Sequence, residues 1–324
     1  MTEKLDLLAV GGPFVFDRIA VLDRLPPLGG TVLFPGLSQE LEKKHFGGCI
    51  VNVAVASRVL GLAVGLAGFI GKDFESSGYR AHLDRVGIMA RWLQEVNDQD
   101  IAHCYSFYDP QGTKLSFMDG VGSTHPLELT IPDEVIRNAR RIVLVGGSKN
   151  DSHSDSLLDI AMRAGKAQVP VALAWAGGVV NIESRFFKWI DTLLCNHYEI
   201  ESIRQHFGLD PHSSIPGLGL KNVFVTSGSK GSDVYSEGRK VHIPVVTPEV
   251  FMDPTGAGDS YAGGVLAGML WGKTPEECGR IGAVVSSFVV EKKGCQTNLP
   301  SRKLLEWRYR TAFGETLNKT DGDQ

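Results

Sequence analysis

Cysteine motifs are missing from this chain of 324 residues. It has only five cysteines, which are widely spaced and contain no Cys-x-x-Cys pair. Disulfide frameworks normally use an even number of cysteines, and thiolate metal sites use closely spaced ones. The pattern therefore favours a reduced protein of the cytoplasm. The five are Cys49, Cys104, Cys195, Cys278 and Cys295.

Long apolar runs and an excess of one charge are also missing. No apolar run approaches the ~18 residues that a membrane span needs, and residues 1–6 are too charged for a secretory signal. The 33 basic and 37 acidic side chains leave a net charge of −4. A nucleic-acid-binding domain would be expected to carry a basic patch or excess. We therefore expect neither a membrane nor a nucleic-acid partner.

Two glycine-rich nucleotide motifs are absent as well. The Walker loop, Gly-x-x-x-x-Gly-Lys-Ser/Thr, occurs nowhere in the chain. A dinucleotide fold needs Gly-x-Gly-x-x-Gly between its first strand and first helix. Here the apolar run 5–10 is followed by Gly11-Gly12-Pro13 and then by a second extended run, 14–21. The sequence therefore argues against a dehydrogenase.

What the chain does have is a segment with two carboxylates, Asp253-Pro254-Thr255-Gly256-Ala257-Gly258-Asp259, that leads straight into a helix. Small residues at 256–258 leave the first backbone N–H groups of that helix open, and the helix dipole favours an anion there. Asp259 falls in the first turn, where it is placed to take a proton from a hydroxyl that attacks a phosphoryl group. Aspartates at a helix start often serve only as caps, but two aspartates around three small residues exceed what capping requires. The predicted helix is amphipathic, with an apolar stripe at Ala262, Val265, Leu266, Met269 and Leu270.

Residues 253–259 match throughout the signature Asp-(Thr or Pro)-Thr-Gly-Ala-Gly-Asp, and the chain thereby resembles the ribokinase or PfkB superfamily of carbohydrate and nucleoside kinases. The resemblance implies a transferase that uses ATP and Mg²⁺ to phosphorylate a hydroxymethyl group of a small sugar or sugar-containing substrate. It implies Asp259 as the catalytic base. It also implies that Gly256, Ala257 and Gly258 stabilise charge on the transferred phosphoryl group.

The acceptor side of the resemblance rests on two places. Asp17 alternates with apolar neighbours in the run 14–21, which fits a solvated edge residue as well as a functional one. Gly47 and Gly48 precede a helix, and such a pair alone is usually only a turn or a hinge. The family has an aspartate just after its first strand and a Gly-Gly pair followed by an asparagine. The resemblance therefore implies acceptor contacts from Asp17, Gly47, Gly48 and Asn52.

The ATP side rests on segments 196–199 and 226–231, which resemble the family's Asn-x-x-Glu and Thr-x-Gly-x-x-Gly elements. The asparagine and glutamate of the first segment also have the spacing of a helix capping box, and the two roles are compatible. The glutamate, Glu199, is implied to organise Mg²⁺ through water, because Mg²⁺ binds few protein carboxylates directly. The ATP contacts implied by the resemblance are Asn196, Thr226, Gly228 and Gly231.

A loop near the end of the chain, 293–298, follows a predicted helix and is expected to form part of the adenine pocket. In many relatives the same loop helps to hold a monovalent cation through backbone carbonyls. The resemblance thus implies a K⁺ site beside Asp253 and Thr255.

Strand and helix patterns alternate regularly from residue 126 onward. This alternation predicts an α/β fold with a doubly wound, mostly parallel sheet flanked by helices. Segments 13–46 and 88–125 have short alternating or aromatic runs and many turn residues. The resemblance implies that they form a small β-sheet lid within a single ribokinase-like domain, residues 1–324. The predicted strands are 141–146, 169–174, 192–195 and 223–226, with helical spacers near 154–164, 181–190 and 197–207.

The acceptor stays open between a sugar and an adenosine-like nucleoside, because kinases of both kinds share these motifs. Segments 42–45 and 294–296 look somewhat like those of nucleoside kinases. A non-catalytic sugar or nucleotide sensor is an alternative of another class, although a sensor has no need of a base such as Asp259. ADP as donor and a homodimer formed through the lid also stay open.

Overall fold

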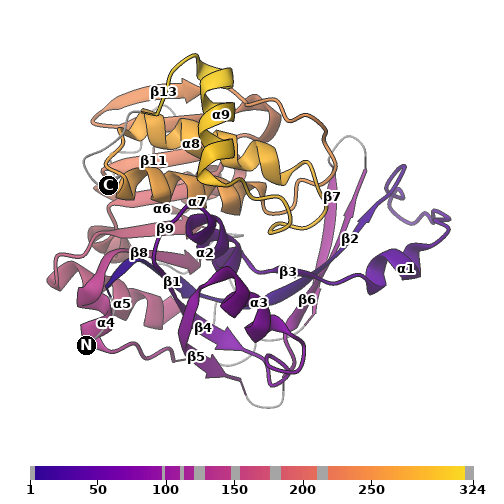
Figure 1. Ribbon diagram of the computed structural model, residues 1–324, viewed down its shortest axis with the longest axis horizontal. Helices are drawn as coiled ribbons and strands as arrows, with labels where there is room; N and C mark the ends of the chain where they lie inside the picture. Colours follow the sequence, from indigo (N-terminus) through magenta and orange to yellow (C-terminus); the bar gives the residue numbers. More distant parts are fainter. Residues whose placement is uncertain are drawn as a thin grey trace.

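The computed structural model describes residues 4–96, 99–109, 113–119, 128–146, 154–175, 184–209 and 218–317. Their main feature is a nine-stranded sheet with the order β13-β12-β11-β10-β9-β8-β1-β4-β5 (Figure 1). Neighbours from β5 to β11 are parallel, and the hairpin of β12 and β13 adds an antiparallel edge. The predicted doubly wound sheet is confirmed. Its strands are β1 (Leu5–Gly11), β4 (Val64–Ile70), β5 (Met89–Glu95), β8 (Ala139–Gly146), β9 (Val171–Trp175), β10 (Thr192–Asn196), β11 (Asn222–Thr226), β12 (Ser232–Ser236) and β13 (Arg239–Ile243).

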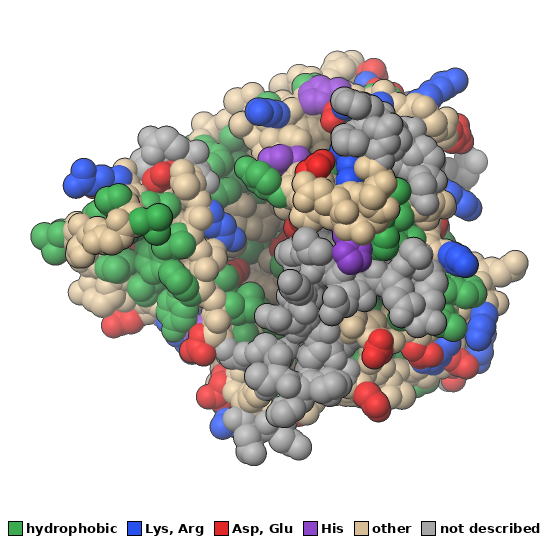
Figure 2. All heavy atoms as spheres, turned by 180° about the vertical axis from the view of Figure 1, so that it is seen from behind, with side chains coloured by type: hydrophobic (Ala, Val, Ile, Leu, Met, Phe, Trp, Pro, Cys, Tyr) green, Lys and Arg blue, Asp and Glu red, His purple; other side chains and the backbone are tan. Residues whose placement is uncertain are grey.

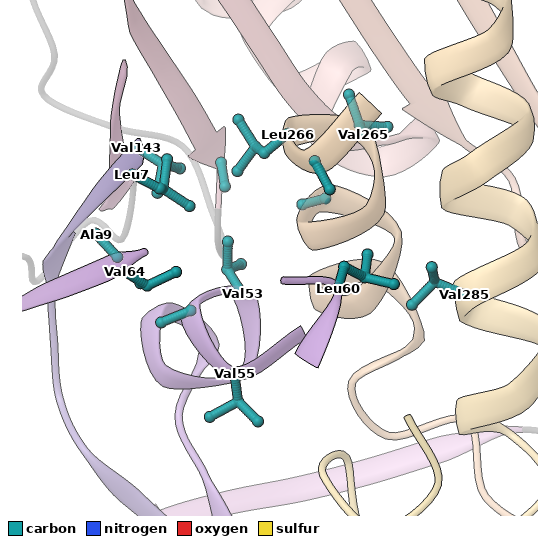
Figure 3. Close-up of a cluster of buried hydrophobic side chains, with 14 of the residues drawn as sticks. Leu7, Ala9, Val53, Val55, Leu60, Val64, Val143, Val265, Leu266 and Val285 are labelled. Carbon is teal, nitrogen blue, oxygen red and sulfur yellow. The ribbon is translucent and has the colours of Figure 1, made fainter. Parts of the chain in front are cut away.

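The central strands are mostly apolar because both faces of the sheet are covered by helices. Along β1, Leu7 and Ala9 belong to the hydrophobic core on one face, and Leu8 and Val10 belong to the core on the other. Figure 3 shows the first core, where Leu7 and Ala9 lie near Val53 of α2. The helices of this face are α2 (Cys49–Val59), α3 (Tyr79–Val86), α7 (Ala257–Leu270), α8 (Pro275–Val289) and α9 (Arg302–Phe313). The second face carries α4 (Asp133–Asn138), α5 (Ser154–Lys166), the 3₁₀ turn η1 (Ser184–Trp189) and α6 (His197–Phe207).

Helix α7, which was expected to be amphipathic, is buried on nearly all sides. It lies between α2 and α8 as well as over the sheet, so residues outside the predicted stripe are covered too. Its glycines allow this close packing: an added Cβ on Gly263 would lie 2.6 Å from Cβ of Ala56, and one on Gly264 would lie 2.9 Å from Cα of Gly282. The helix that carries Asp259 is therefore held firmly in the core.

A second, four-stranded sheet with the order β3-β2-β6-β7 projects from one side of the molecule (Figure 1). It contains parts of both segments that were expected to form the lid, with the short helix α1 (Leu37–Glu42) beside it. One part of the expected lid lies elsewhere: β5 continues the large sheet as the parallel neighbour of β4. Its chain returns from α3 to that sheet edge before entering the small sheet. The small sheet consists of β2 (Val15–Val21), β3 (His45–Gly47), β6 (Ala102–Tyr108) and β7 (Lys114–Asp119).

Candidate active site

Segments that are far apart in the sequence meet where the small sheet joins the large one. Asp17 comes from β2, Asn52 from the first turn of α2, and Asp259 from the first turn of α7. The loop that follows α8 adds residues 294–296, which contact all three neighbouring segments. The structure thus brings the predicted acceptor residues and the predicted base together.

Asp259 is half-buried at the start of α7 and bonded to another predicted site residue. Its Oδ2 accepts a hydrogen bond of 2.8 Å from Nδ2 of Asn52. Burial raises the pKa of the Asp259 carboxyl above its ordinary value, while the Asn52 hydrogen bond and the charge of Lys114 lower it. A carboxylate with a raised pKa is a better proton acceptor near neutral pH than an ordinary aspartate.

Asp17 is almost fully buried, with 5% of its surface exposed. Burial raises the pKa of its carboxyl to about 7; a hydrogen bond from the Cys295 thiol opposes this shift, and the charge of Asp259 adds to it. The thiol lies 3.4 Å from Oδ2 of Asp17. A Cβ atom at Gly47 would overlap the same carboxyl group, so the close approach of these two residues requires glycine. Gly48 has a φ of +94°, which also favours glycine.

Asp253 holds the loop that precedes α7. Its side chain is fully buried, and Oδ1 accepts from the backbone N–H of Thr255 at 2.9 Å and from its hydroxyl at 2.5 Å. Oδ2 accepts from the N–H of Gly294 at 2.8 Å, which ties this loop to the one after α8. The Thr255 hydroxyl also lies 3.0 Å from the phenol oxygen of Tyr108 on β6. The carboxylate is thus engaged by protein donors, and a cation here would depend on backbone carbonyls.

The backbone N–H groups at the start of α7 differ in whether they already donate a hydrogen bond within the protein. The N–H of Ala257 donates to the carbonyl of Pro254 at 3.1 Å. Those of Gly256 and Gly258 form no backbone hydrogen bond within the described part of the chain. An added Cβ at Gly258 would meet no atom within 4 Å, so its amide is open to approach. Gly256 has a φ of +75° and lies against Cys295.

The predicted ATP residues lie at the carboxyl ends of two adjacent parallel strands, where Asn196 and Thr226 are register partners. Ligands of open α/β sheets bind at this edge. The capping box is present: Oδ1 of Asn196 accepts from the N–H of Glu199 at 3.0 Å, and a Glu199 carboxylate oxygen accepts from the N–H of Asn196 at 2.8 Å. Gly228 and Gly231, with φ of +56° and +84°, form the turn η3 (Gly228–Lys230) and its exit.

The thiol of Cys49, at the first position of α2, links the acceptor and ATP sides electrostatically. Its pKa is raised well above the usual range by the charge of Asp259, by burial and by Asp17, with a smaller effect from Glu199. Glu199 therefore acts within the same electrostatic environment as the two carboxylates. Mg²⁺ usually binds through substrate phosphates, water and one or two carboxylates. The Glu199 carboxylate at this edge of the sheet therefore fits a Mg²⁺–ATP complex. Among the described residues, no cluster of three or more His, Cys, Asp or Glu is arranged to hold a metal ion alone.

Three residues of the site were missed by the sequence analysis. Lys114 on β7 lowers the pKa of both site carboxylates, although burial has the larger, opposite effect on each. Gln296, expected as part of an adenine pocket, contacts Asn52 and His82. Alternation within a strand or loop does not reveal such contacts.

Figure 2 shows the surface hollowed between the projecting small sheet and the body of the molecule.

A family model of pfkB family carbohydrate kinases matches residues 36–302. The chain belongs to this family. It is a phosphotransferase of the carbohydrate and nucleoside kinase type, and its acceptor is an alcohol group. In the part of this PfkB kinase that the structure describes, no helix is long and apolar enough to cross a membrane.

Known relatives match nearly the whole chain. A nucleoside kinase of Methanothermobacter thermautotrophicus is 31% identical over 320 residues, covering 97% of this chain and 98% of that protein. A nucleoside kinase of Methanocaldococcus jannaschii is 27% identical over 316 residues, covering 93% and 96%. The crystal structure of the M. jannaschii enzyme, described as an archaeal member of the ribokinase family, matches with a TM-score of 0.75 at 25% identity, covering 96% of this chain and 100% of that one. A ribokinase of Arabidopsis thaliana is 27% identical over 311 residues, covering 91% and 79%.

Proposed function

We propose that this PfkB kinase transfers the γ-phosphoryl group of ATP to the hydroxymethyl group of a ribosyl substrate, with a nucleoside as the first candidate. The observation that carries the proposal is the half-buried carboxylate of Asp259, held by Asn52 at the start of α7 beside the buried Asp17. The raised pKa of the Asp259 carboxyl, caused mainly by burial, suits a general base. The ribosyl class is supported by the full-length likeness to nucleoside kinases and a ribokinase.

On the acceptor side, Asp17 accepts hydrogen bonds from ring hydroxyls, and the second N–H of the Asn52 amide donates to a ring oxygen. Gly47 and Gly48 let the substrate approach the backbone, since no side chain stands between them and Asp17. The acceptor hydroxymethyl group then faces Oδ1 of Asp259. Asp259 removes the hydroxyl proton as the oxygen attacks the γ-phosphorus.

On the phosphate side, the open N–H groups of Gly256 and Gly258, with Ala257 between them, stabilise negative charge on the transferred group. Asn196, Thr226, Gly228 and Gly231 contact ATP at the strand ends. Glu199 orients the Mg²⁺ complex of ATP through water; bound Mg²⁺ supplies charge neutralisation at the phosphates. The loop beside Asp253 and Thr255 offers backbone carbonyls for K⁺.

A free sugar such as a pentose is the second candidate acceptor, favoured by the ribokinase likeness. The aromatic residues Phe14, Phe16 and Phe117 favour neither acceptor. Phe14 and Phe16 are buried and pack with Tyr79, whereas Phe117 on β7 is 57% exposed. A base would therefore have to stack on the outer strands of the small sheet.

We also propose a cellular location, a lid and an oligomeric state for this kinase. We place it in the cytoplasm because all five cysteines are free. We treat the small sheet as a lid that excludes water from the site when substrate is bound. Exposed apolar residues of β7, with Phe117 the bulkiest, support a homodimer formed through that sheet.

The test is ADP release by the purified protein with Mg-ATP against nucleosides, pentoses and ketohexoses. Stimulation by nucleosides is the expected result. Stimulation by sugars alone would replace the nucleoside assignment with the sugar one, and binding without turnover across the whole panel would favour a sensor.

A further inference from the structure

A continuous chain of side-chain hydrogen bonds runs from the proposed base to α3. Asn52 Nδ2 donates to Asp259 Oδ2 at 2.8 Å, and Gln296 Nε2 donates to Asn52 Oδ1 at 2.8 Å. Gln296 Oε1 lies 2.6 Å from Nε2 of His82. The four residues come from α7, α2, the loop after α8, and α3. This connection extends well beyond the groups that would touch a substrate.

When Asp259 is ionised, the hydrogen-bond chain has only one self-consistent set of donors and acceptors. A carboxylate can only accept, so Asn52 must present its NH₂ group to Asp259. The Asn52 carbonyl then faces Gln296, which must present its own NH₂ group. The Gln296 carbonyl therefore faces His82, and the imidazole must carry a hydrogen on Nε2. The ionised carboxylate at one end and the Nε2 hydrogen of His82 at the other thus require the same orientation of both amides.

The histidine ring is itself held in place. It stacks on Phe46 of β3 with ring centroids 3.9 Å apart and an interplanar angle of 3°. Burial lowers the pKa of His82, the Gln296 contact opposes that shift, and the charge of Arg85 adds to it. A neutral ring has a single N–H group, and the chain requires this hydrogen on Nε2. Because Phe46 belongs to the small sheet, that sheet supports the His82 end of the hydrogen-bond chain.

We propose that His82 and Gln296 are positioning residues that fix the orientation of the Asn52 amide and thereby the free oxygen of the base. Asn52 occupies Oδ2 of Asp259 and the Cys49 thiol is a weaker donor to the same carboxylate, so Oδ1 is the oxygen that faces the acceptor hydroxyl. This inference rests on the proposed role of Asp259 as base. It assigns a positioning role to His82 and Gln296 that the sequence alone did not indicate.

Interrupting the chain removes the donor to Oδ1 of Asn52, so its amide is held less firmly and donates to Asp259 less of the time. The carboxylate then loses a donor, and its pKa rises further. The other groups that act on Asp259, Lys114 and Cys49, stay as they are. Loss of a hydrogen bond to a charged group should raise the pKa of Asp259. Because the free oxygen is then no longer aimed at the acceptor hydroxyl, kcat at neutral pH should fall by roughly tenfold to a hundredfold. The KM for Mg-ATP should not change.

The experiment compares Gln296→Met and His82→Phe, which remove the two donors while keeping side-chain size. His82→Gln places an amide nitrogen where Nε2 was and should recover part of the loss seen in His82→Phe. Gln205→Met is the matched control, because Gln205 is exposed on α6 and, within the described residues, its side chain donates to Glu201 of its own helix. Each variant is measured for kcat, both KM values, thermal unfolding, and the titration of the Asp259 carboxyl by ¹³C NMR, assigned with Asp259→Asn.

A raised Asp259 pKa with lowered kcat in Gln296→Met and His82→Phe, and partial recovery in His82→Gln, supports the inference. An Asp259 titration identical to that of the wild type overturns it, even if the variants unfold at lower temperature, since a merely structural role would give that result. The NMR titration does not need turnover. If the wild type phosphorylates no acceptor, the proposed function fails while the hydrogen-bond chain is still decided by the carboxyl titration.

Discussion

Three aspartates in the site differ in what their carboxylates contact. Asp253 accepts three hydrogen bonds from the protein and has no part of its side chain exposed. Within the described residues, Asp17 receives a weak thiol donor, and Asp259 receives the Asn52 amide and the weaker Cys49 thiol. Asp253 has the most protein donors and is suited to hold a loop. Asp17 and Asp259 have fewer, which suits their proposed roles of binding the substrate and reacting with it. Residue type alone does not separate these roles.

The buried Asp17 should reduce the stability of the unliganded enzyme as pH rises. Because burial raises its folded-state pKa from 3.8 to about 7, the folded protein keeps a proton there that the unfolded chain has released. Wild-type stability should therefore fall as pH increases through that window. Asp17→Asn removes this titration, so it should unfold at a higher temperature than the wild type above about pH 7 but not below about pH 4.

Thermal unfolding across this pH range checks the prediction, with the exposed Asp23→Asn as control. An unfolding temperature for Asp17→Asn that stays parallel to the wild type at every pH would contradict it. The same variant should bind the acceptor more weakly, so stability and binding change in opposite directions.

At the scale of elements, the junction of β3 and α2 depends on the absence of a side chain. Gly47→Ala should raise the KM for the acceptor at least tenfold, because the new methyl group overlaps the Asp17 carboxyl and about 1.4 kcal/mol corresponds to tenfold in binding. The KM for Mg-ATP should change little. Gly12→Ala is the control, since its methyl would lie 3.6 Å from the Phe69 ring, an ordinary contact distance. Equal acceptor KM values for the two variants would refute the account of this junction.

Helices α6 and α8 both begin with a capping box. Comparing the two caps separates the effect of Asn196 on stability from its effect on ATP binding. Asn196 begins α6 at the ATP side of the site, and Thr274 begins α8 away from the strand ends. Replacing either residue with alanine should lower the free energy of unfolding by about 1 kcal/mol, because each caps a helix. Only Asn196→Ala should also raise the KM for Mg-ATP. Denaturant unfolding and steady-state kinetics measure the two quantities, and unchanged ATP kinetics in Asn196→Ala would reduce its role to capping.

Elements with strong local signals could be predicted from the sequence. The strands β8, β10 and β11 and the helix α6 were expected close to their observed bounds, since short apolar runs and a capping box determine them locally. The assignment of β5 was wrong because pairing with β4 depends on the path of the chain. The burial of α7 was underestimated because its glycines contact α2 and α8, which no periodicity records.

At the scale of the whole molecule, the candidate site is assembled from both sheets. The motif residues were predicted because each lies in a recognisable segment. Their connection through Gln296 and His82 was not, since those residues are 214 positions apart and no local pattern records their contact. Contacts of that kind follow from the packing of α2, α3 and α7 on one face of the large sheet.

The small sheet ends in β7, an edge strand with exposed apolar side chains, and Figure 2 shows apolar residues gathered on this projecting part. Leu115, Phe117 and Met118 are 43%, 57% and 61% exposed. An edge strand of this kind favours pairing with another chain. We predict that light scattering will find a dimer and that Phe117→Lys will shift it toward monomer. A wild-type monomer at all concentrations tested would contradict the proposed homodimer.

The most direct test of the account is phosphoryl transfer by Asp259→Asn. The central claim is that Asp259 accepts the acceptor proton, and general bases typically contribute ~10²–10⁴-fold. With the best acceptor and Mg-ATP, we predict a loss of about two to four orders of magnitude in kcat, with unfolding temperature and acceptor binding close to those of the wild type. A variant that turns over at the wild-type rate would contradict the assignment of Asp259 as the base.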